Sequence, residues 1–453
     1  MATINLSLAQ WLDKLSQAFI SGKHTMAAQL KSQLTKAGLG ATLARLVGER
    51  GKSALGQGDI VLAAYYLQWL EELAGSDWPA QLMLAELRHA VQDPEAARAG
   101  FAAHIHRHPV FRYQPAENGC AQPIRCAILL TSGDGSQINF TRDGFALKEG
   151  LTAMEHLVRV PNCAAAMVFC EGLRRPADLD AFDVVINAIS DADKHEPLLH
   201  HLQNLLSVCS KPIINHPTPI LANRRDQICK SLVGKVDFVI PRLVRVEVGN
   251  EAHNCLAACI DTASLRYPVL ARPAGTQTGI GLVRLNTRDE AARVEASPGS
   301  YYVSEYHEFR SADGYYRKYR SWSIDGVSYP NHLFVSDSWN VHGAVRRTLM
   351  QNNPSFLAED KAFGEGRCPA DSPRIEAMMC ALREVVGLDY FGVDFGIDQA
   401  GRPVFFEANP TMLSFDPEMH AKIPHLVDVE RRHIGAFQAM LHSRLFAGEY
   451  SSQ

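Results

Sequence analysis

Apolar residues are spaced differently in the first quarter of the chain and in the rest. Up to about residue 110 the sequence is rich in alanine and leucine and is helix-forming. From Ile124–Leu130 onward, short apolar runs typical of buried parallel strands alternate with helical patterns such as Leu198–Val208. This alternation predicts an open parallel sheet. Ligands of such sheets bind at the carboxyl ends of strands, so the loops Gly133–Gln137 and Asn187–Asp191 are candidate substrate contacts. The expected fold class is α/β, preceded by an all-α region.

The helical region contains a repeat of 34 residues. Three positions recur at this distance, first as Asp59, Ala63 and Leu67 and then as Asp93, Ala97 and Phe101. A turn, small residues and then a large apolar residue at this period resemble the helical hairpins of tetratricopeptide repeats. The alternative is a generic helical bundle. The resemblance implies a surface for a peptide or protein partner, or a contact within a homodimer.

A two-stranded hairpin is predicted near the C-terminal end of the second part. Two apolar runs, Phe391–Ile397 and Pro403–Ala408, flank a cluster of turn residues. Residues i and i+2 of a strand share a face, so Glu407 and Asn409 project together, and an in-register pairing brings Asp394 opposite them. Two carboxylates and one amide oxygen are ligands that suit Mg²⁺. The structural alternative is a carboxylate at a bulge and a Glu-Asn pair that caps the strand end.

Two further strands carry cations. Tyr267–Arg272 leads into the Gly- and Thr-rich loop Pro273–Gly281, whose glycines let backbone N–H groups approach an anion. The strand Arg317–Ile324 places Lys318 and Arg320 on one face. Two cations on one face of a half-buried strand need an anion, whereas the alternative is a solvated basic edge.

Composition excludes several classes of protein. The 453 residues suffice for two or three domains, and the net charge of −4 gives no general attraction to nucleic acid or to a membrane. The ten cysteines form no CxxC pair, which argues against zinc, and their scatter is typical of a reducing compartment. The pattern contains no signal peptide and no run near the roughly 18 apolar residues of a membrane span. We therefore expect a cytoplasmic protein.

The hairpin motifs resemble the metal-binding end of the ATP-grasp fold, in the branch of glutathione synthetase and the ribosomal-protein glutamate ligases. Gly392-Val393-Asp394 and Glu407-Ala408-Asn409 match the two strands that hold Mg·ATP in that branch. The D-alanine ligase branch usually has an arginine where this chain has Gly392, which argues against D-alanine ligase chemistry. The resemblance covers roughly residues 124 to 420.

This resemblance implies ATP and Mg²⁺ as cofactors and a role for each matching residue. Asp394, Glu407 and Asn409 would hold the metal, and the catalytic cations Lys318 and Arg320 would act at the reacting phosphate. The other nucleotide contacts would come from Arg272, Gly275, Gly279 and Gly281 at the loop, from Lys318, and from Glu305 and Tyr306 at the hinge that meets adenine.

Two positions depart from the family pattern. Arg272 stands where lysine is usual, keeps the positive charge and adds a fork that can bind two phosphate oxygens. Gln227 stands where many relatives have a lysine that reaches a phosphate. That contact is therefore either absent or made by Arg224, Arg225 or Lys230.

Residues 331–369 interrupt the expected catalytic core with a polar segment that we expect to be irregular. Loops of this length are usually functional or disordered, and aromatic, histidine and arginine residues together favour a binding loop. The candidate substrate residues are His332, Trp339, His342, Arg346 and Arg347. Paired arginines suit a substrate carboxylate, and the alternative is that both point into solvent. Together with the helical repeats, the segment favours an amino-acid or peptide substrate.

The expected domains are residues 1–115, a tetratricopeptide-like region; 116–222, a parallel α/β domain; and 223–453, an ATP-grasp domain with a small part at 223–305 and a large part at 306–453. The resemblance implies an ATP-dependent ligase that joins a carboxylate to an amine through an acyl phosphate and releases ADP and phosphate. Two alternatives remain open. One is an interaction module with a regulatory or vestigial nucleotide site, and the other is an ATP-grasp kinase.

Overall fold

The chain forms two compact units. The computed structural model describes residues 7–114, 123–133, 136, 138–141, 144–147, 163–234, 237–251, 255–276, 279–367, 372–410, 412 and 422–446. One unit consists of Met1–Phe111, Thr131–Lys148 and Val168–Leu173, and the other of Arg112–Leu130, Glu149–Met167 and Arg174–Gln453. The predicted class, α/β with an all-α N-terminal region, is confirmed, whereas the three predicted domain boundaries stay a prediction.

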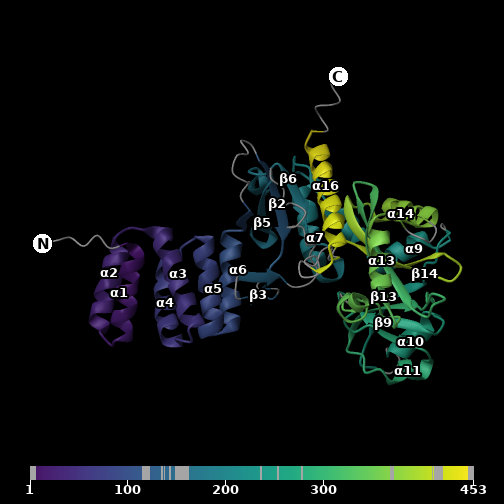
Figure 1. Ribbon diagram of the computed structural model, residues 1–453, viewed down its shortest axis with the longest axis horizontal. Coiled ribbons are helices and arrows are strands. Elements are labelled where there is room, and N and C mark those ends of the chain that lie inside the picture. Colours follow the sequence, from purple (N-terminus) through teal and green to yellow (C-terminus); the bar gives the residue numbers. More distant parts are fainter. Residues whose placement is uncertain are drawn as a thin grey trace. The chain divides into compact units, whose positions relative to one another are not determined.

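Six helices make up most of the first unit and lie side by side (Figure 1). They are α1 (Leu8–Ile20), α2 (His24–Lys36), α3 (Gly40–Gly56), α4 (Ile60–Leu73), α5 (Trp78–Val91) and α6 (Pro94–Arg107). A short antiparallel pair, β3 (Ile138–Thr141) and β4 (Gly144–Leu147), belongs to the same unit.

The sequence repeat coincides with a structural repeat of helix starts. Asp59 and Asp93 are the N-caps of α4 and α6, and their side chains accept hydrogen bonds from the main-chain N–H groups of Leu62 and Glu95. The repeated alanines are fully buried, as are Leu67 and, nearly so, Phe101. Small residues at these positions allow neighbouring helices to pack closely. Assignment of the helices to the tetratricopeptide family stays a prediction.

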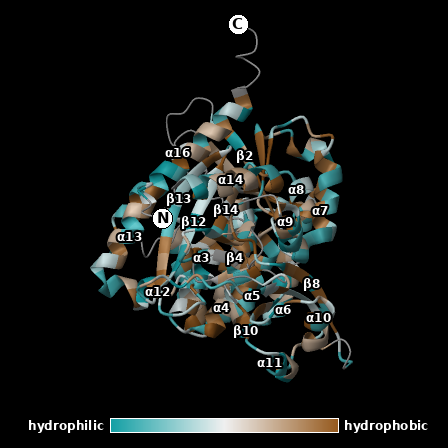
Figure 2. Cartoon of the chain, turned by 90° about the vertical axis from the view of Figure 1, so that its right-hand side faces the viewer, coloured by the Kyte–Doolittle hydropathy of each residue, from teal (hydrophilic) through white to brown (hydrophobic). Residues whose placement is uncertain are grey.

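A sheet with strands in the order β1-β5-β2-β6-β7 opens the second part of the chain. Its strands are β1 (Val110–Gln114), β2 (Ile124–Leu130), β5 (Cys163–Phe169), β6 (Val184–Asn187) and β7 (Ile213–Ile214). β6 pairs in parallel with both β2 and β7, which agrees with the predicted parallel sheet. The helices α7 (Ala192–Leu206) and α8 (Pro217–Ala222) follow β6 and β7. Hydrophilic and hydrophobic residues alternate along α7 (Figure 2), and its leucines form the buried side.

The second unit contains two more sheets, both antiparallel where their pairing is described. The smaller has the order β10-β9-β11-β8, with β8 (Leu243–Val248), β9 (Val269–Pro273), β10 (Val283–Leu285) and β11 (Gly299–Glu305). The larger has the order β13-β12-β14-β15, with β12 (Tyr316–Ile324), β13 (Val327–Ser336), β14 (Tyr390–Ile397) and β15 (Pro403–Asn409). The hairpin predicted at the C-terminal end of the core is therefore β14–β15.

Helices accompany each of these sheets. α10 (Leu256–Thr262) and α11 (Arg288–Arg293) contribute to the core of the smaller sheet. α9 (Arg225–Leu232), α12 (Val345–Thr348), α13 (Pro354–Gly364) and α14 (Ser372–Val386) pack on the larger sheet, and α16 (His425–Phe446) contacts β12 and β13. The sequence predicted that segment 331–369 is irregular, and this prediction is wrong for most of its described residues. The segment completes β13 and then forms α12, a 3₁₀ turn at Met350–Asn352 and α13.

Acid is expected to destabilise the second unit through His433 on α16. The imidazole is 1% exposed, and burial, together with the charge of Arg432, lowers the pKa of His433 from 6.5 to about 4, although a hydrogen bond to the Pro330 carbonyl opposes the shift. The unfolded chain therefore takes up the proton first. This contribution to stability is complete above about pH 6.5 and is lost as the pH falls towards about 4.

At about pH 5 the loss from His433 alone is about 2 kcal/mol relative to neutral pH. Urea unfolding at the two pH values measures it. The variant His433→Gln is expected to unfold with a smaller difference between the two pH values. An equal difference in the variant and the wild type would contradict the assignment.

Candidate functional site

A row of polar side chains crosses the larger sheet on one face. His332 of β13 lies opposite Arg320 of β12, Arg320 lies opposite Asp394 of β14, and Asp394 lies opposite Glu407 of β15. Directly opposed residues of antiparallel strands project to the same face. Asn409 stands two residues beyond Glu407 and projects with it, as predicted from the sequence. A bulge after Asp394 leaves the register of this row intact.

Asp394 is the most buried member of the row, with 1% of its surface exposed. The Nε and Nη2 of Arg320 donate to Oδ1 and Oδ2 of Asp394 at 2.6 and 2.8 Å, and Nζ of Lys318 lies 3.2 Å from Oδ2. Burial alone would raise the pKa of Asp394, but the charges of Arg320 and Lys318 outweigh it and hold the pKa well below its usual range. The predicted metal ligand and the two predicted catalytic cations therefore lie in direct contact.

Glu407 and Asn409 close the row at the edge of the sheet. The Asn409 side-chain amide lies 3.4 Å from Oε2 of Glu407, and the guanidinium of Arg225 makes an ion pair with the same carboxylate. Arg225 is one of the three cations that the sequence offered as a substitute for the usual lysine, the alternative being that the contact is absent. Gln227 is exposed, and its side-chain amide donates to Asp226. The substitution at Gln227 is thus accompanied by a cation two residues earlier that reaches the hairpin.

A second polar row crosses the smaller sheet. Tyr302 of β11 lies opposite Arg272 of β9 on one side and opposite Arg245 of β8 on the other. Burial and the nearby charge of Arg225 lower the pKa of Arg272 to about 10. Its guanidinium donates to the carbonyl and the hydroxyl of Thr276, so it holds the start of the Gly-rich loop.

The glycines of that loop adopt backbone conformations that favour glycine. Gly275, Gly279 and Gly281 have φ values of +70°, +76° and +68°. A Cβ at Gly275 would lie 3.1 Å from the side chain of Lys194 on α7, and one at Gly281 would lie 2.9 Å from Pro273. Residues 277 and 278 lie outside the described part of the chain. The loop therefore approaches its neighbours closely at both ends.

The predicted hinge follows β11. The main-chain N–H groups of Glu305 and Tyr306 donate to the carbonyls of Arg242 and Pro268, at 2.9 and 2.8 Å. These two N–H groups are thus engaged within the protein, and the predicted adenine contact of the hinge stays a prediction. The Tyr306 ring packs between the guanidinium of Arg284, 3.9 Å from its centroid, and the edge of Trp339. Trp339 of the predicted specificity segment is therefore brought to the hinge.

The other candidate substrate residues lie in different surroundings. His332 is 6% exposed, and its Nε2 has no hydrogen-bond partner. Burial and the charges of Arg320 and Arg346 hold the pKa of His332 well below its usual range, so the ring is neutral. Arg347 and His342 are exposed. Arg346 is instead buried, so the structure does not bring the two predicted arginines to one ligand.

Arg346 is committed to a buried carboxylate. Its Nη2 lies 2.9 Å from Oδ2 of Asp360, which is fully buried and also accepts from the Leu333 N–H and contacts His425. Arg346→Ala is expected to lower the free energy of unfolding by about 3 kcal/mol, because it leaves a buried charge short of its partner. The exposed neighbour supplies the control, since Arg347→Ala is expected to change stability by less than about 0.5 kcal/mol. Denaturant unfolding of both variants measures the difference, and equal small effects would contradict this account.

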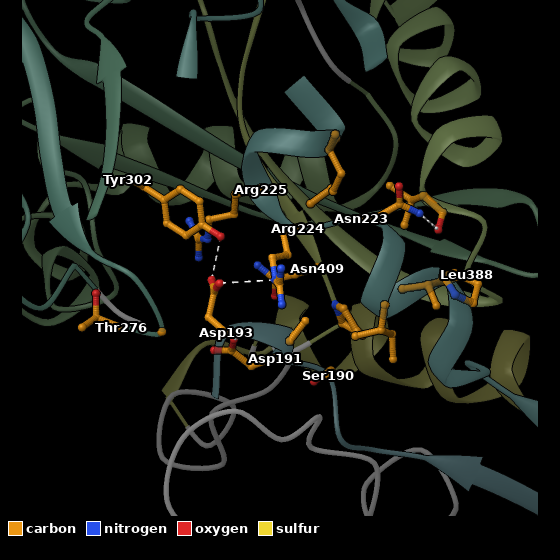
Figure 3. A pocket seen from close by; sticks show the side chains of 18 residues that line it. Ser190, Asp191, Asp193, Asn223, Arg224, Arg225, Thr276, Tyr302, Leu388 and Asn409 are labelled. Carbon is orange, nitrogen blue, oxygen red and sulfur yellow. Dashed lines mark hydrogen bonds and ion pairs between the residues drawn. The ribbon is translucent and has the colours of Figure 1, made fainter. Parts of the chain in front are cut away.

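A cavity of about 50 Å³ is lined by residues of both sheets, among them Tyr302 of the smaller and Asn409 of the larger (Figure 3). Its lining includes Asp191 and Asp193 at the start of α7, Arg224 and Arg225 at the start of α9, and Tyr302. Gly275, Thr276 and Asn409 contribute from the loop and the hairpin. The sequence marked the loop Asn187–Asp191 as a candidate, but Asp193 and Tyr302 were missed. Their contact across 109 positions leaves no local signal in the sequence.

The described residues contain neither a cluster of acidic, histidine and cysteine ligands nor a membrane-spanning helix. Within these ranges no group of three or more histidine, cysteine, aspartate and glutamate residues could hold a metal ion. The predicted metal site is of another kind, because its third ligand is the amide oxygen of Asn409. No described helix is long and apolar enough to span a bilayer.

No family model and no curated protein matches the chain. Solved structures with a similar fold include a RimK domain ATP-grasp protein from Sphaerobacter thermophilus, at 13% identity and a TM-score of 0.42, covering 70% of this chain and 98% of that one. Another is the D-alanine–D-alanine ligase from Coxiella burnetii, at 10% identity and 0.37, covering 73% and 100%. A third is a carboxyaminoimidazole ribonucleotide synthase from Aspergillus clavatus in complex with ATP, at 14% and 0.38, covering 64% and 71%. At these identities the similarity concerns the fold alone.

Proposed function

We propose that this protein is an ATP-dependent ligase that joins a carboxylate to an amine and releases ADP and phosphate. The observation that carries the proposal is the row Arg320–Asp394–Glu407 with Asn409 beside it. In it, carboxylate and amide oxygens suited to Mg²⁺ lie against cations suited to phosphate oxygens. Such a site needs little covalent chemistry from the protein, because positioning and charge neutralisation do most of the work in phosphoryl transfer.

The donor set of the hairpin fits a magnesium ion. Asp394, Glu407 and Asn409 would hold it, and all three project from one face of two paired strands. When bound, the metal would neutralise charge on the ATP phosphates. Both carboxylates are already neutralised by arginines, so the cations of the site would move from carboxylate to phosphate oxygens when Mg·ATP binds. Lys318 and Arg320 would then stabilise the charge that develops as the substrate carboxylate attacks the γ-phosphate.

In this proposal the ATP phosphates lie between the hairpin and a second group of residues, which consists of Arg225, Arg272 and the Gly-rich loop. Arg272 holds Thr276, and the loop glycines, which adopt positive φ values, would let backbone N–H groups approach an anion. The substrate amine would then displace phosphate from the acyl phosphate. We propose an amino-acid or peptide substrate, with the helical unit as the surface for a peptide or protein partner.

The test uses the whole protein with Mg·ATP and a mixture of the proteinogenic amino acids, followed by a second reaction with cell extract. We expect release of ADP and a new mass equal to a carboxylate plus an amine minus water. Mg·ATP binding without ADP release from either mixture would overturn the proposal. A product heavier by one phosphoryl group and no amide would show that the reaction stops at phosphoryl transfer.

A nucleotide-binding module without ligase activity is the second candidate. Neutralisation of Asp394 by Arg320 and of Glu407 by Arg225 favours it, because a hairpin that keeps these ion pairs has no need of a metal. Titration of ATP with and without Mg²⁺ separates the two functions. Binding that is indifferent to Mg²⁺ supports the module, and binding that requires Mg²⁺ supports the ligase.

A further inference from the structure

The cavity between α7, α9 and β11 contains a buried carboxylate that is only partly satisfied. The side chain of Asp193 is 9% exposed, and its Oδ2 accepts a hydrogen bond of 2.7 Å from the hydroxyl of Tyr302. Its Oδ1 has no hydrogen-bond partner. Leaving a buried carboxylate oxygen unmatched is costly, and burial accordingly raises the pKa of Asp193. Figure 3 shows Asp193 in the middle of the residues that line the cavity.

Two arginines make long ion pairs with this oxygen but donate no hydrogen bond to it. Nε of Arg224 and Nη1 of Arg245 lie 3.6 and 3.5 Å from Oδ1 of Asp193, and the Nε atoms of both arginines are buried and lack a hydrogen-bond partner. At these lengths the charges attract each other, but the hydrogen-bonding capacity of Oδ1 and of the two Nε atoms stays unused. A group that donates to Oδ1 of Asp193 and accepts from an arginine Nε would use this capacity.

The charges around the cavity favour a molecule that carries both signs. A phosphate or a simple carboxylate would meet Arg224 and Arg225 but would be repelled by Asp191 and Asp193, and a simple amine would meet the reverse conflict. A zwitterion satisfies both ends. The cavity has room for roughly three to five water-sized groups, which matches the ammonium and carboxylate of an amino acid and is too small for a nucleotide.

We propose that this cavity binds the head group of an α-amino-acid substrate, with its ammonium on Asp193 and Asp191 and its carboxylate on Arg224 and Arg225. The inference rests on the proposed ligase function and names the substrate end of the same site. Arg225 connects the two, since it lines the cavity and also pairs with Glu407 of the hairpin. The bound head group would thus lie beside Asn409, which also lines the cavity, and one side chain away from Glu407.

Calorimetric titration of each proteinogenic amino acid into the full-length protein, with Mg²⁺ and a non-hydrolysable ATP analogue present, tests the proposal. We expect at least one amino acid to bind. Its amide, which lacks the carboxylate charge, and its 2-hydroxy acid, which lacks the amine, should each bind at least about tenfold more weakly. Equal binding of either analogue, or binding of no amino acid, would overturn the proposal.

The variants Asp193→Asn and Arg224→Gln are each expected to weaken that binding at least about tenfold. Asp193→Asn is nearly isosteric, and a melting curve for each variant verifies folding. The control Asp289→Asn removes the same charge from an exposed position on α11 and should bind like the wild type. Wild-type affinity in both cavity variants would mean that only ordered water occupies the site.

The outcomes separate this inference from the proposed function. If the wild type forms an amide and releases ADP while both cavity variants keep its KM for every substrate, the ligase stands and the head-group site is wrong. If an amino acid binds and Asp193→Asn abolishes that binding, but no ADP forms with any mixture, the site stands and the ligase reaction is wrong.

Discussion

Glu407→Gln is expected to lower turnover at least about a hundredfold and to leave the fold intact, because charge neutralisation in a partly dry site is worth several kcal/mol. Glutamine keeps the shape of the side chain and one oxygen, but it removes the negative charge that lies beside Asn409 and pairs with Arg225. The loss should appear in kcat, since the missing charge acts on the phosphates during transfer. The midpoint of the Mg²⁺ dependence should rise as well.

Steady-state release of ADP, measured over a range of Mg²⁺ concentrations, checks this expectation. The matched control is Glu384→Gln, an exposed position on α14, which should keep wild-type kcat and Mg²⁺ dependence. A melting temperature close to that of the wild type verifies that the Glu407 variant is folded. Near-normal turnover in the folded Glu407 variant would refute the assignment of the hairpin.

The hairpin could be predicted from the sequence because its information is local. Alternation with a period of two fixes which side chains of β14 and β15 share a face, and turn residues between the strands fix their pairing. Asp394, Glu407 and Asn409 are accordingly found on one face, in the predicted register. Lys318 and Arg320 follow from the same alternation on β12. The sequence could not tell that these two cations contact Asp394, since the contact depends on the order of strands in the sheet.

Segment 331–369 was misjudged for a physical reason that can be located. α13 buries Phe356, Asp360 and Phe363, a spacing that places them on one helical face. The middle member is charged, so the apolar period is broken and the sequence appears polar. Only the structure shows that Asp360 is matched by Arg346 and His425. A count of apolar residues therefore does not detect this helix, because one of its buried positions is a charged residue in an ion pair.

The cavity illustrates the other kind of missing information. Its residues come from the ends of α7 and α9, from the Gly-rich loop and from β11. Apart from Tyr302 in the middle of β11, the polar residues named above lie at element ends or in loops, where the sequence signals only a cap or a turn; Asp191 is in fact the N-cap of α7. Convergence of Asp193, Tyr302 and Arg224 is a property of tertiary structure. The sequence nevertheless marked one of the contributing loops, because parallel strands present their ligand-binding ends in a predictable place.

Loss of the ion pair between Arg320 and Asp394 is expected to lower the free energy of unfolding more than any other single substitution proposed. Arg320→Met should lower the free energy of unfolding by about 3–5 kcal/mol, because Asp394 would remain buried with Lys318 as its remaining cationic partner. In the double variant Arg320→Met/Asp394→Leu both charges of the pair are removed, and Lys318, whose side chain is 17% exposed, is expected to turn its ammonium towards solvent. Replacement of a buried ion pair by apolar side chains of similar volume is often close to neutral, so most of the lost stability should return.

Activity should not return with stability, and this difference tests whether the pair is functional. Both residues are proposed to act on Mg·ATP, so the single and the double variant should each lose ADP release while the double variant unfolds at a denaturant concentration near that of the wild type. The exposed ion pair Arg431–Asp428 on α16 is the control, and Arg431→Met should change stability by less than about 0.5 kcal/mol and leave turnover unchanged. If the double variant regains turnover together with stability, Arg320 and Asp394 serve only the fold, and the proposed metal site loses its central ligand. If instead stability returns and turnover does not, the buried pair is retained for its chemistry, since apolar residues can replace it in the core.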